Sequence, residues 1–200
     1  MRPSSTSASH QHLAFEAELA DGQSRFVRER LRLPLGQEAS FGWLRHPPSV
    51  LVVPRRADGR LLLVRRWRAA VGRWVLEFPT GVLESGESAA RGAARLLRTL
   101  HGEGEGRWHP LGDLRPNPGY SDERMTIGWM ALDPRRDAEL DGPLAAPEPL
   151  ASAEAAEGGT VRRHLCSPEA LEAAFSALAE PVDGRSVTAW FLARRGGIAG

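Results

Sequence analysis

The sequence has 200 residues and a formal net charge of +1, a length that suits one domain or one domain with a small appendage. With 42% hydrophobic and 26% charged residues, it is neither collagen-like nor wholly disordered, and no stretch approaches the length of an apolar membrane span. The near balance of 26 basic and 25 acidic residues argues against a dedicated nucleic-acid-binding protein. We expect a cytoplasmic protein, because Cys166 is the only cysteine and the polar first residues lack the apolar core of a signal peptide.

The N-terminal part of the chain shows strand patterns. Residues 1–11 are predicted to form a disordered tail, since they are rich in serine and lack periodicity. Residues 12–46 are predicted to form a β-rich N-terminal extension of two or three strands. Within it, residues 26–31 alternate, so the three odd-numbered side chains are expected on one face of a strand. A Pro-Pro pair then breaks the pattern, and a second domain is predicted over residues 47–200.

The clearest pattern in the second domain is a β-hairpin. Residues 50–53 and 61–64 are apolar runs on either side of a turn at Asp58 and Gly59. Continuous apolar runs are typical of strands that are buried on both faces of a sheet. The sequence therefore predicts an α/β fold in which helices cover both faces of a sheet.

Two helices are expected in this domain. The first spans residues 88–101 and ends at Gly102, a common C-terminal stop. The second spans residues 168–180, with Ser167 as its N-cap and Pro168 at its first helical position. The remaining segments are a strand at 124–132, a long flexible loop at 133–159, and either a last strand or a short helix at 187–192.

The segment from residue 81 to residue 102 resembles the Nudix hydrolase signature. That signature is a Gly, five residues, a Glu, seven residues, and then Arg-Glu-aliphatic-any-Glu-Glu-any-Gly. Four residues of this chain stand at the required intervals: Gly81, Glu87, Arg95 and Gly102. The three acidic positions inside the helix instead read Leu96, Thr99 and Leu100, so the box is degenerate.

Three further motifs resemble the ADP-ribose pyrophosphatase branch of that family. Residues 64–68 read Val-Arg-Arg-Trp-Arg, where the branch has Val-Arg-Gln-Tyr-Arg. Residues 77–81 resemble Glu-Leu-Pro-Ala-Gly, and residues 118–123 resemble Pro-Gly-Phe-Ser-Asp-Glu. The resemblance implies a Nudix-type mixed β-sheet sandwiched between α-helices, preceded by a small β-rich extension that helps form a homodimer.

The resemblance also assigns catalytic roles. Cleavage of a diphosphate needs an activated water and positive charge near the phosphoryl oxygens, for which Mg²⁺ held by carboxylates is the usual device. The resemblance implies Mg²⁺ or Mn²⁺ as the cofactor, Glu87 as a catalytic and metal-binding residue, Thr80 as a further metal candidate, and Glu123 as the best candidate for the general base. A solvated loop acid is the alternative for Glu123. Glu87 could equally complement the helix dipole, and Glu103 or Glu105 could replace lost ligands.

Candidates for substrate binding lie on both sides of the box. Arg66 and Arg68 share one face of a strand, and guanidinium groups bind phosphate oxygens bidentately, although a solvated strand end is the alternative. Trp43 could stack on an adenine, or pack in the core or a dimer interface. Glu77 and Pro118 match residues at the site of the resembled branch, while Glu77 could instead be ion-paired with an arginine.

The function implied by the resemblance is hydrolysis of a nucleoside diphosphate-linked compound such as ADP-ribose to AMP and a sugar phosphate. We expect this activity to be weakened because the box glutamates are missing, which leaves enzymatic activity uncertain. The alternative is a catalytically inactive module that binds or senses a nucleotide sugar. A purely structural role is a third interpretation, which the loop at 118–123 disfavours. The expected partners are a small nucleotide or nucleotide sugar and a second copy of the chain, with neither nucleic acid nor membrane.

Overall fold

The structure is a computed structural model that describes residues 11–21, 23–102, 104–132, 161–177 and 181–198. The chain divides into two compact units. Unit 1 comprises Met1–Pro47 and Arg115–Arg124, and unit 2 comprises Pro48–Leu114 and Met125–Gly200. The predicted tail, apart from Gln11, and the predicted loop at 133–159 lie outside the described residues.

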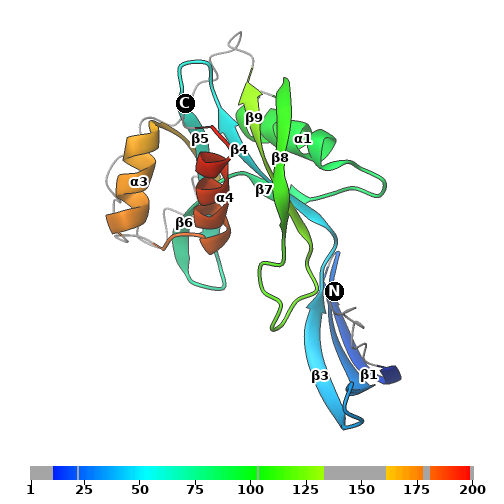
Figure 1. The fold of residues 1–200 in the computed structure, drawn as a ribbon. Helices are drawn as coiled ribbons and strands as arrows, with labels where there is room; N and C mark the ends of the chain where they lie inside the picture. The colour runs from blue at the N-terminus through cyan, green and yellow to red at the C-terminus, as the bar shows by residue number, and fades with distance from the viewer. Residues whose placement is uncertain (1–10, 22, 103, 133–160, 178–180, 199–200) are drawn as a thin grey trace, which may run out of the picture. The chain divides into compact units, whose positions relative to one another are not determined.

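Unit 1 contains a three-stranded antiparallel sheet in the order β1-β2-β3 (Figure 1). Its strands are β1 (Gln11–Asp21), β2 (Ser24–Arg32) and β3 (Glu38–Arg45). In β2, Val27, Glu29 and Leu31 are buried, and the residues between them are exposed. The predicted alternation of residues 26–31 is therefore confirmed, and it places a carboxylate on the buried face of the sheet.

The segment Arg115–Arg124 belongs to unit 1 because hydrogen bonds attach it to the end of β3. The Leu44 N–H donates to the Tyr120 carbonyl at 2.7 Å, and the Asp122 N–H donates to the Leu44 carbonyl at 3.1 Å. The His46 N–H donates to the Asp122 carboxylate at 2.8 Å. These bonds fix a loop from the middle of the sequence beside a strand of the N-terminal extension.

Unit 2 is built on a seven-stranded mixed sheet with the order β10-β5-β4-β9-β8, in which β6 pairs with β5 and β7 pairs with β4. The strands are β4 (Ser49–Arg55), β5 (Leu61–Arg68), β6 (Arg73–Glu77), β7 (Thr80–Val82), β8 (Gly106–Leu114), β9 (Met125–Leu132) and β10 (Val161–Cys166). Only the β4–β9 pair is parallel among the described strands. The predicted hairpin is β4 and β5, and the predicted strand at 124–132 is β9, so both predictions are confirmed.

Helices cover both faces of this sheet, as the apolar runs predicted. On one face, Val50, Val52 and Leu62 form a core with Ala93 and Leu97 of α1 (Ala89–His101). On the other face, alternate residues of the same strands form a second core with α3 (Pro168–Ala177) and α4 (Gly184–Arg195). The sandwich of a mixed sheet between helices is therefore confirmed (Figure 1).

The predicted helix ends agree with the structure where it describes them. Ser88 caps α1, since its Oγ accepts from the Arg91 N–H, and the helix stops at Gly102, whose φ of 69° suits glycine. The Ser167 Oγ accepts from the Ala170 N–H at the start of α3. The open choice at 187–192 resolves as a helix, because these residues lie inside α4. None of the described helices is long and apolar enough to cross a membrane.

Candidate functional site

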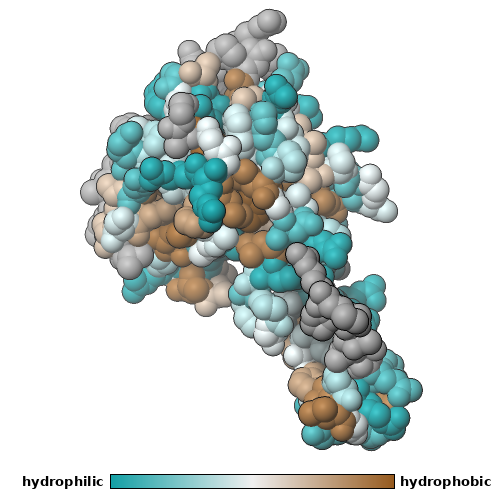
Figure 2. Space-filling model, viewed as in Figure 1, coloured by the Kyte–Doolittle hydropathy of each residue, from teal (hydrophilic) through white to brown (hydrophobic). Residues whose placement is uncertain are grey.

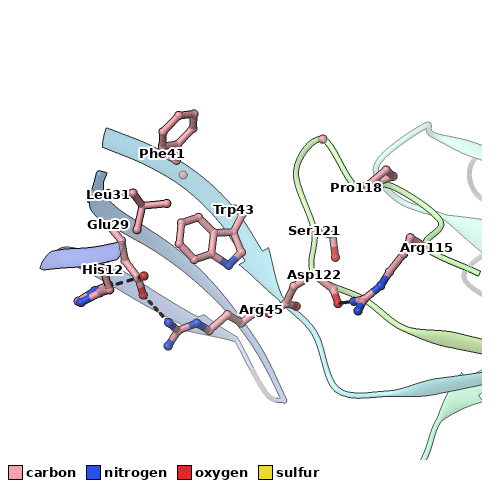
Figure 3. A pocket seen from close by; sticks show the side chains of 12 residues that line it. His12, Glu29, Leu31, Phe41, Trp43, Arg45, Arg115, Pro118, Ser121 and Asp122 are labelled. Atoms are coloured by element: carbon pink, nitrogen blue, oxygen red, sulfur yellow. Dashed lines mark hydrogen bonds and ion pairs between the residues drawn. The ribbon is translucent and has the colours of Figure 1, made fainter. Parts of the chain in front are cut away.

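A pocket of about 770 Å³ lies within unit 1, between the buried face of the sheet and the loop that follows β8 (Figure 3). Its lining brings together Trp43 and Pro118, both predicted from the sequence to bind substrate. The other lining residues are His12, Glu29, Leu31, Phe41, Gly42, Arg45, Arg115, Gly119, Ser121 and Asp122. Two predicted binding residues from distant parts of the sequence thus line one cavity.

Glu29 supplies a buried carboxylate to this pocket. It projects from the inner face of β2 and is only 3% exposed. Arg45 donates a short hydrogen bond to one of its oxygens, and the His12 Nε2 lies 3.3 Å from the other. The Arg45 guanidinium also lies 5.9 Å from the centre of the Trp43 ring. The pocket therefore offers an aromatic surface beside a charge-compensated carboxylate, a lining suited to a planar polar ring.

The opposite wall of the pocket is the 115–124 loop, whose conformation is stabilised by hydrogen bonds between its own residues. The Arg115 guanidinium donates to the Asp122 carbonyl, and the Glu123 N–H donates to the Ser121 Oγ at 3.1 Å. Glu123 itself, the predicted general base, is 7% exposed and has the His46 Nδ1 at 3.8 Å from its Oε1. Its role as a base stays a prediction.

In unit 2, Glu87 is bound by an arginine of the helix that follows it. The Arg95 Nε donates to one carboxylate oxygen at 2.9 Å, and the Arg95 Nη2 donates to the other at 2.7 Å. The Glu84 N–H donates to the same carboxylate at 2.9 Å. The bonds from Arg95, with a smaller contribution from the Glu84 N–H, lower the pKa of Glu87 to about 2. Arg95 also donates to the Val82 carbonyl, so this pair ties the loop before α1 to the helix.

The three positions of α1 that are acidic in the family signature, 96, 99 and 100, carry uncharged side chains. Leu96 packs against the core that the sheet shares with α1 and covers Gly81, because its Cδ2 would lie 2.5 Å from a Cβ on that glycine. The Thr99 hydroxyl donates to the Arg95 carbonyl at 3.0 Å. The Thr80 hydroxyl, a predicted metal candidate, donates to the Phe78 carbonyl at 3.1 Å. These hydroxyls are engaged with the backbone of their own segments.

NUDIX proteins generally use divalent metal ions, which need several oxygen ligands, carboxylates above all. Among the described residues, no group of three or more His, Cys, Asp or Glu side chains could hold a metal ion. Glu105 is exposed before β8, and Glu103 lies outside the described part of the chain. The residues around α1 that the structure describes therefore do not fit a divalent metal site.

The two arginines of β5 that were assigned to substrate binding differ in their surroundings. The Arg68 Nε and Nη2 donate to the two Glu77 oxygens at 2.5 Å each, and Glu77 is only 1% exposed. These bonds raise the pKa of Arg68. Glu77 is thus ion-paired, which was the alternative considered for it. Arg66 is half-buried, and its Nε is buried without a hydrogen-bond partner.

Several pocket residues were not identified from the sequence. Glu29, Arg45 and Arg115 look like ordinary charged residues of strands and loops. The alternation of β2 did place Glu29 among apolar side chains, and a lone carboxylate on a buried face is a usable signal. Arg115 had no such signal, because only the backbone pairing of its loop with β3 brings it to the pocket.

Comparison with known proteins gives the following relatives. An ADP-ribose pyrophosphatase of Mycobacterium tuberculosis is 33% identical over 101 residues, 50% of this chain and 49% of the relative. One of Bacillus subtilis is 28% identical over 99 residues, 50% of this chain and 54% of the relative. A methanol dehydrogenase activator of Bacillus methanolicus is 29% identical over 93 residues, 46% of this chain and 50% of the relative. The chain therefore spans about half the length of the curated relatives it matches.

The crystal structure of an ADP compounds hydrolase matches 94% of this chain and 93% of its own, with a TM-score of 0.70 and 21% identity. At that identity the likeness concerns the fold, and it agrees with a mixed sheet between helices. The model of the NUDIX domain family matches residues 45–191. The resemblance drawn from the box and the three motifs is thereby confirmed, and the chain belongs to the NUDIX domain family.

Proposed function

We propose that this protein binds ADP-ribose or a related nucleoside diphosphate compound and hydrolyses it slowly. In this reaction water adds across one P–O–P bridge, and the products are AMP and a sugar phosphate. The observation that carries the proposal is the pocket of unit 1, which unites Trp43 with Pro118. The names of the two pyrophosphatase relatives support the same class of substrate.

The lining of the pocket suits an adenine ring. Trp43 and Phe41 offer aromatic surface, and stacking of a base on an aromatic ring contributes about 1–3 kcal/mol. Arg45 and Arg115 add hydrogen-bond donors, and the Ser121 hydroxyl can donate or accept. A nucleobase needs both properties, because it has apolar faces and polar edges.

Hydrolysis of the diphosphate puts negative charge on phosphoryl oxygens, which positive side chains stabilise. The arginines of β5 that are predicted to bind substrate, Arg66 and Arg68, carry the guanidinium groups that are candidates to neutralise this charge. Glu123 is proposed as the base that accepts a proton from the attacking water. Because Leu96, Thr99 and Leu100 cannot hold a metal, we infer a rate about a thousandfold below that of a complete box. The Mg²⁺ or Mn²⁺ predicted from the resemblance would supply Lewis acidity if bound.

Calorimetry with ADP-ribose, combined with an assay of AMP release, tests the proposal. We expect ADP-ribose to bind, Trp43→Ala to weaken binding at least tenfold, and AMP to appear slowly, more slowly still in Trp43→Ala. Phe191→Ala is the matched control, since Phe191 is an exposed aromatic side chain of α4. Adding EDTA or Mn²⁺ to the same assay shows whether a metal contributes. Absence of ADP-ribose binding in the wild type would refute the proposal.

Binding without hydrolysis is the second candidate function. The ion pair of Glu87 with Arg95 and the apolar side chains of Leu96 and Leu100 favour it, because they leave α1 without free carboxylates at the box positions. The same assay separates the two candidates. ADP-ribose binding with no AMP release, even over long incubation with Mn²⁺, would replace hydrolysis with a sensing or regulatory role.

We also propose a cytoplasmic homodimer. A reducing compartment is supported by the single cysteine, Cys166, which cannot form a disulfide within the chain. A dimer is supported by exposed apolar side chains on the sheet of unit 1, among them Leu19 and Phe26.

A further inference from the structure

Among three neighbouring arginines of unit 2, Arg66 is the one for which the described residues provide no carboxylate partner. Arg68 is bound by Glu77 through two hydrogen bonds, and the Arg185 Nε donates to Asp183 at 2.8 Å. Arg66 has no such bond to any residue that the structure describes, and its Nε is shielded from solvent without a partner. The three guanidiniums and two carboxylates leave one positive charge uncompensated, and Arg66 is the residue that carries it.

The position of Arg66 keeps this charge partly away from water. On β5 it stands opposite Val75 of β6 and Val161 of β10, so apolar residues flank it on both sides. It shares a face of the strand with Arg68, two residues further on. Burial lowers the pKa of the Arg66 guanidinium, and the charge of Arg68 lowers it further. Glu77 opposes this shift, and Arg185 adds the smallest contribution to the lowering.

A half-buried cation among other cations costs free energy, because partly buried charges are normally paired. Proteins retain such an arrangement where a ligand completes it. The planar guanidinium fork matches two phosphoryl oxygens and binds them bidentately. An apolar or cationic ligand would leave the charge of Arg66 unpaired, so the chemistry that fits is an oxyanion, and the oxyanion that the proposed function supplies is a diphosphate.

We propose that Arg66 binds a phosphoryl group of the ligand and supplies the charge neutralisation for which NUDIX proteins generally use metal ions. Arg68 serves instead to hold the buried Glu77 carboxylate. That the phosphoryl group belongs to a nucleoside diphosphate rests on the proposed function, whereas the anion site itself does not. The resembled branch motif has glutamine at the position of Arg66, so Arg66→Gln restores that residue while it removes the charge.

The test measures binding of inorganic pyrophosphate, AMP and ADP-ribose by calorimetry in phosphate-free buffer with EDTA. We expect Arg66→Gln to weaken pyrophosphate and ADP-ribose about ten- to a hundredfold, the loss for one charge-assisted bidentate contact. Arg107→Gln is the matched control, because Arg107 is exposed on β8 and its substitution removes the same charge. Equal affinities of wild type and Arg66→Gln for both anions would overturn the proposal, as would failure of the wild type to bind either anion.

Thermal unfolding gives a second readout that a merely structural arginine would not share. Without ligand, Arg66→Gln should raise Tm by a few degrees, because the uncompensated cation is removed, while Arg68→Gln should lower Tm by stranding the Glu77 carboxylate. Pyrophosphate should raise the Tm of the wild type more than that of Arg66→Gln. A lower Tm of ligand-free Arg66→Gln would overturn the proposal.

The two proposals fail separately. If pyrophosphate binds through Arg66 but ADP-ribose does not bind, the anion site stands and the proposed function is refuted. If ADP-ribose binds, but neither its affinity nor that of pyrophosphate differs between wild type and Arg66→Gln, the proposed function stands and the anion site is refuted.

Discussion

Glu87 occupies an acidic position of the NUDIX box, yet Arg95 binds both of its carboxylate oxygens. With its pKa lowered to about 2, the carboxylate is charged at neutral pH and held by a cation of its own unit. A proton-transfer group needs a pKa near the working pH, and a metal ligand needs an accessible oxygen. The pair with Arg95 therefore acts as a clamp between the loop and α1.

We predict that Glu87→Gln lowers the free energy of unfolding by about 1–2 kcal/mol at neutral pH, a value reduced for the partial exposure of Arg95. The pKa of Glu87 is lower in the folded than in the unfolded chain, so this stabilisation is complete above pH 4.5 and is lost as the pH falls toward 2. Urea unfolding over a pH series should show the two proteins converging in that window. Glu105→Gln is the control, since Glu105 is exposed before β8 and lies outside the pair of Glu87 with Arg95. A gap that persists unchanged at low pH would argue against the clamp.

At the scale of the element, α1 is a box helix whose inner face is apolar. Ala93 and Leu97 are fully buried in the core, and Leu96 lies over Gly81. In the family signature, positions 96, 99 and 100 are acidic, and residues at this spacing lie on one face of a helix. The spacing of the retained box residues is thus unchanged, while the acidic side chains of the signature are replaced by two leucines and a threonine.

We predict that restoring the acidic positions creates a metal site. The triple variant Leu96→Glu, Thr99→Glu, Leu100→Glu places three carboxylates on one face, and they repel one another without a cation. Mn²⁺ should therefore raise the Tm of the variant by several degrees, whereas it should leave the Tm of the wild type unchanged. AMP release from ADP-ribose should become faster in the variant when Mn²⁺ is present.

The control for this variant carries new acidic residues elsewhere on the same helix. Arg91→Glu combined with Arg98→Glu changes exposed positions two turns apart, so the new carboxylates are too far apart to share an ion. Its Tm should not respond to Mn²⁺. An equal response of the control and the triple variant would mean that Mn²⁺ binds by charge alone.

Much of the fold could be predicted from local sequence. The β4–β5 hairpin and α1 carry strong signals, namely apolar runs around an Asp-Gly turn and a helix bounded by Ser88 and Gly102. Four strands of unit 2 had no such signal, namely β6, β7, β8 and β10. A register shift between Pro110 and Gly112 interrupts β8, and β10 contains two adjacent arginines that look like a solvated segment until its pairing with β5 is known.

The candidate site could be predicted only in part, because its groups come together through tertiary contacts. The family resemblance pointed to Trp43 and Pro118, but only the pairing of the 115–124 loop with β3 places them in one pocket. Sequence also treated Arg66 and Arg68 as equivalent. They differ because the Arg68 guanidinium reaches the Glu77 carboxylate with two hydrogen bonds, whereas the Arg66 Nε is buried without a partner among the described residues.

At the scale of the molecule, apolar side chains reach the surface in both units. In unit 1, Leu19 is 72% exposed and Phe26 is 51% exposed, and they stand opposite each other on β1 and β2. In unit 2, Val187 and Phe191 are exposed on α4, where Figure 2 shows apolar side chains gathered. Single exposed apolar residues are ordinary, whereas a cross-strand pair on an open sheet face forms a contiguous patch.

We predict that the wild type is a dimer and that Leu19→Glu combined with Phe26→Glu makes it a monomer. In a two-fold interface each substitution occurs twice, so four carboxylates would meet across the contact and weaken it at least a hundredfold, about 3 kcal/mol. Sedimentation equilibrium over a concentration series measures this constant. Val187→Glu combined with Phe191→Glu adds the same charge to α4 and should leave the dimer intact. A wild type that is monomeric at every concentration would refute the dimer, and a dimer lost only with the α4 substitutions would place the interface on α4 instead of on the sheet of unit 1.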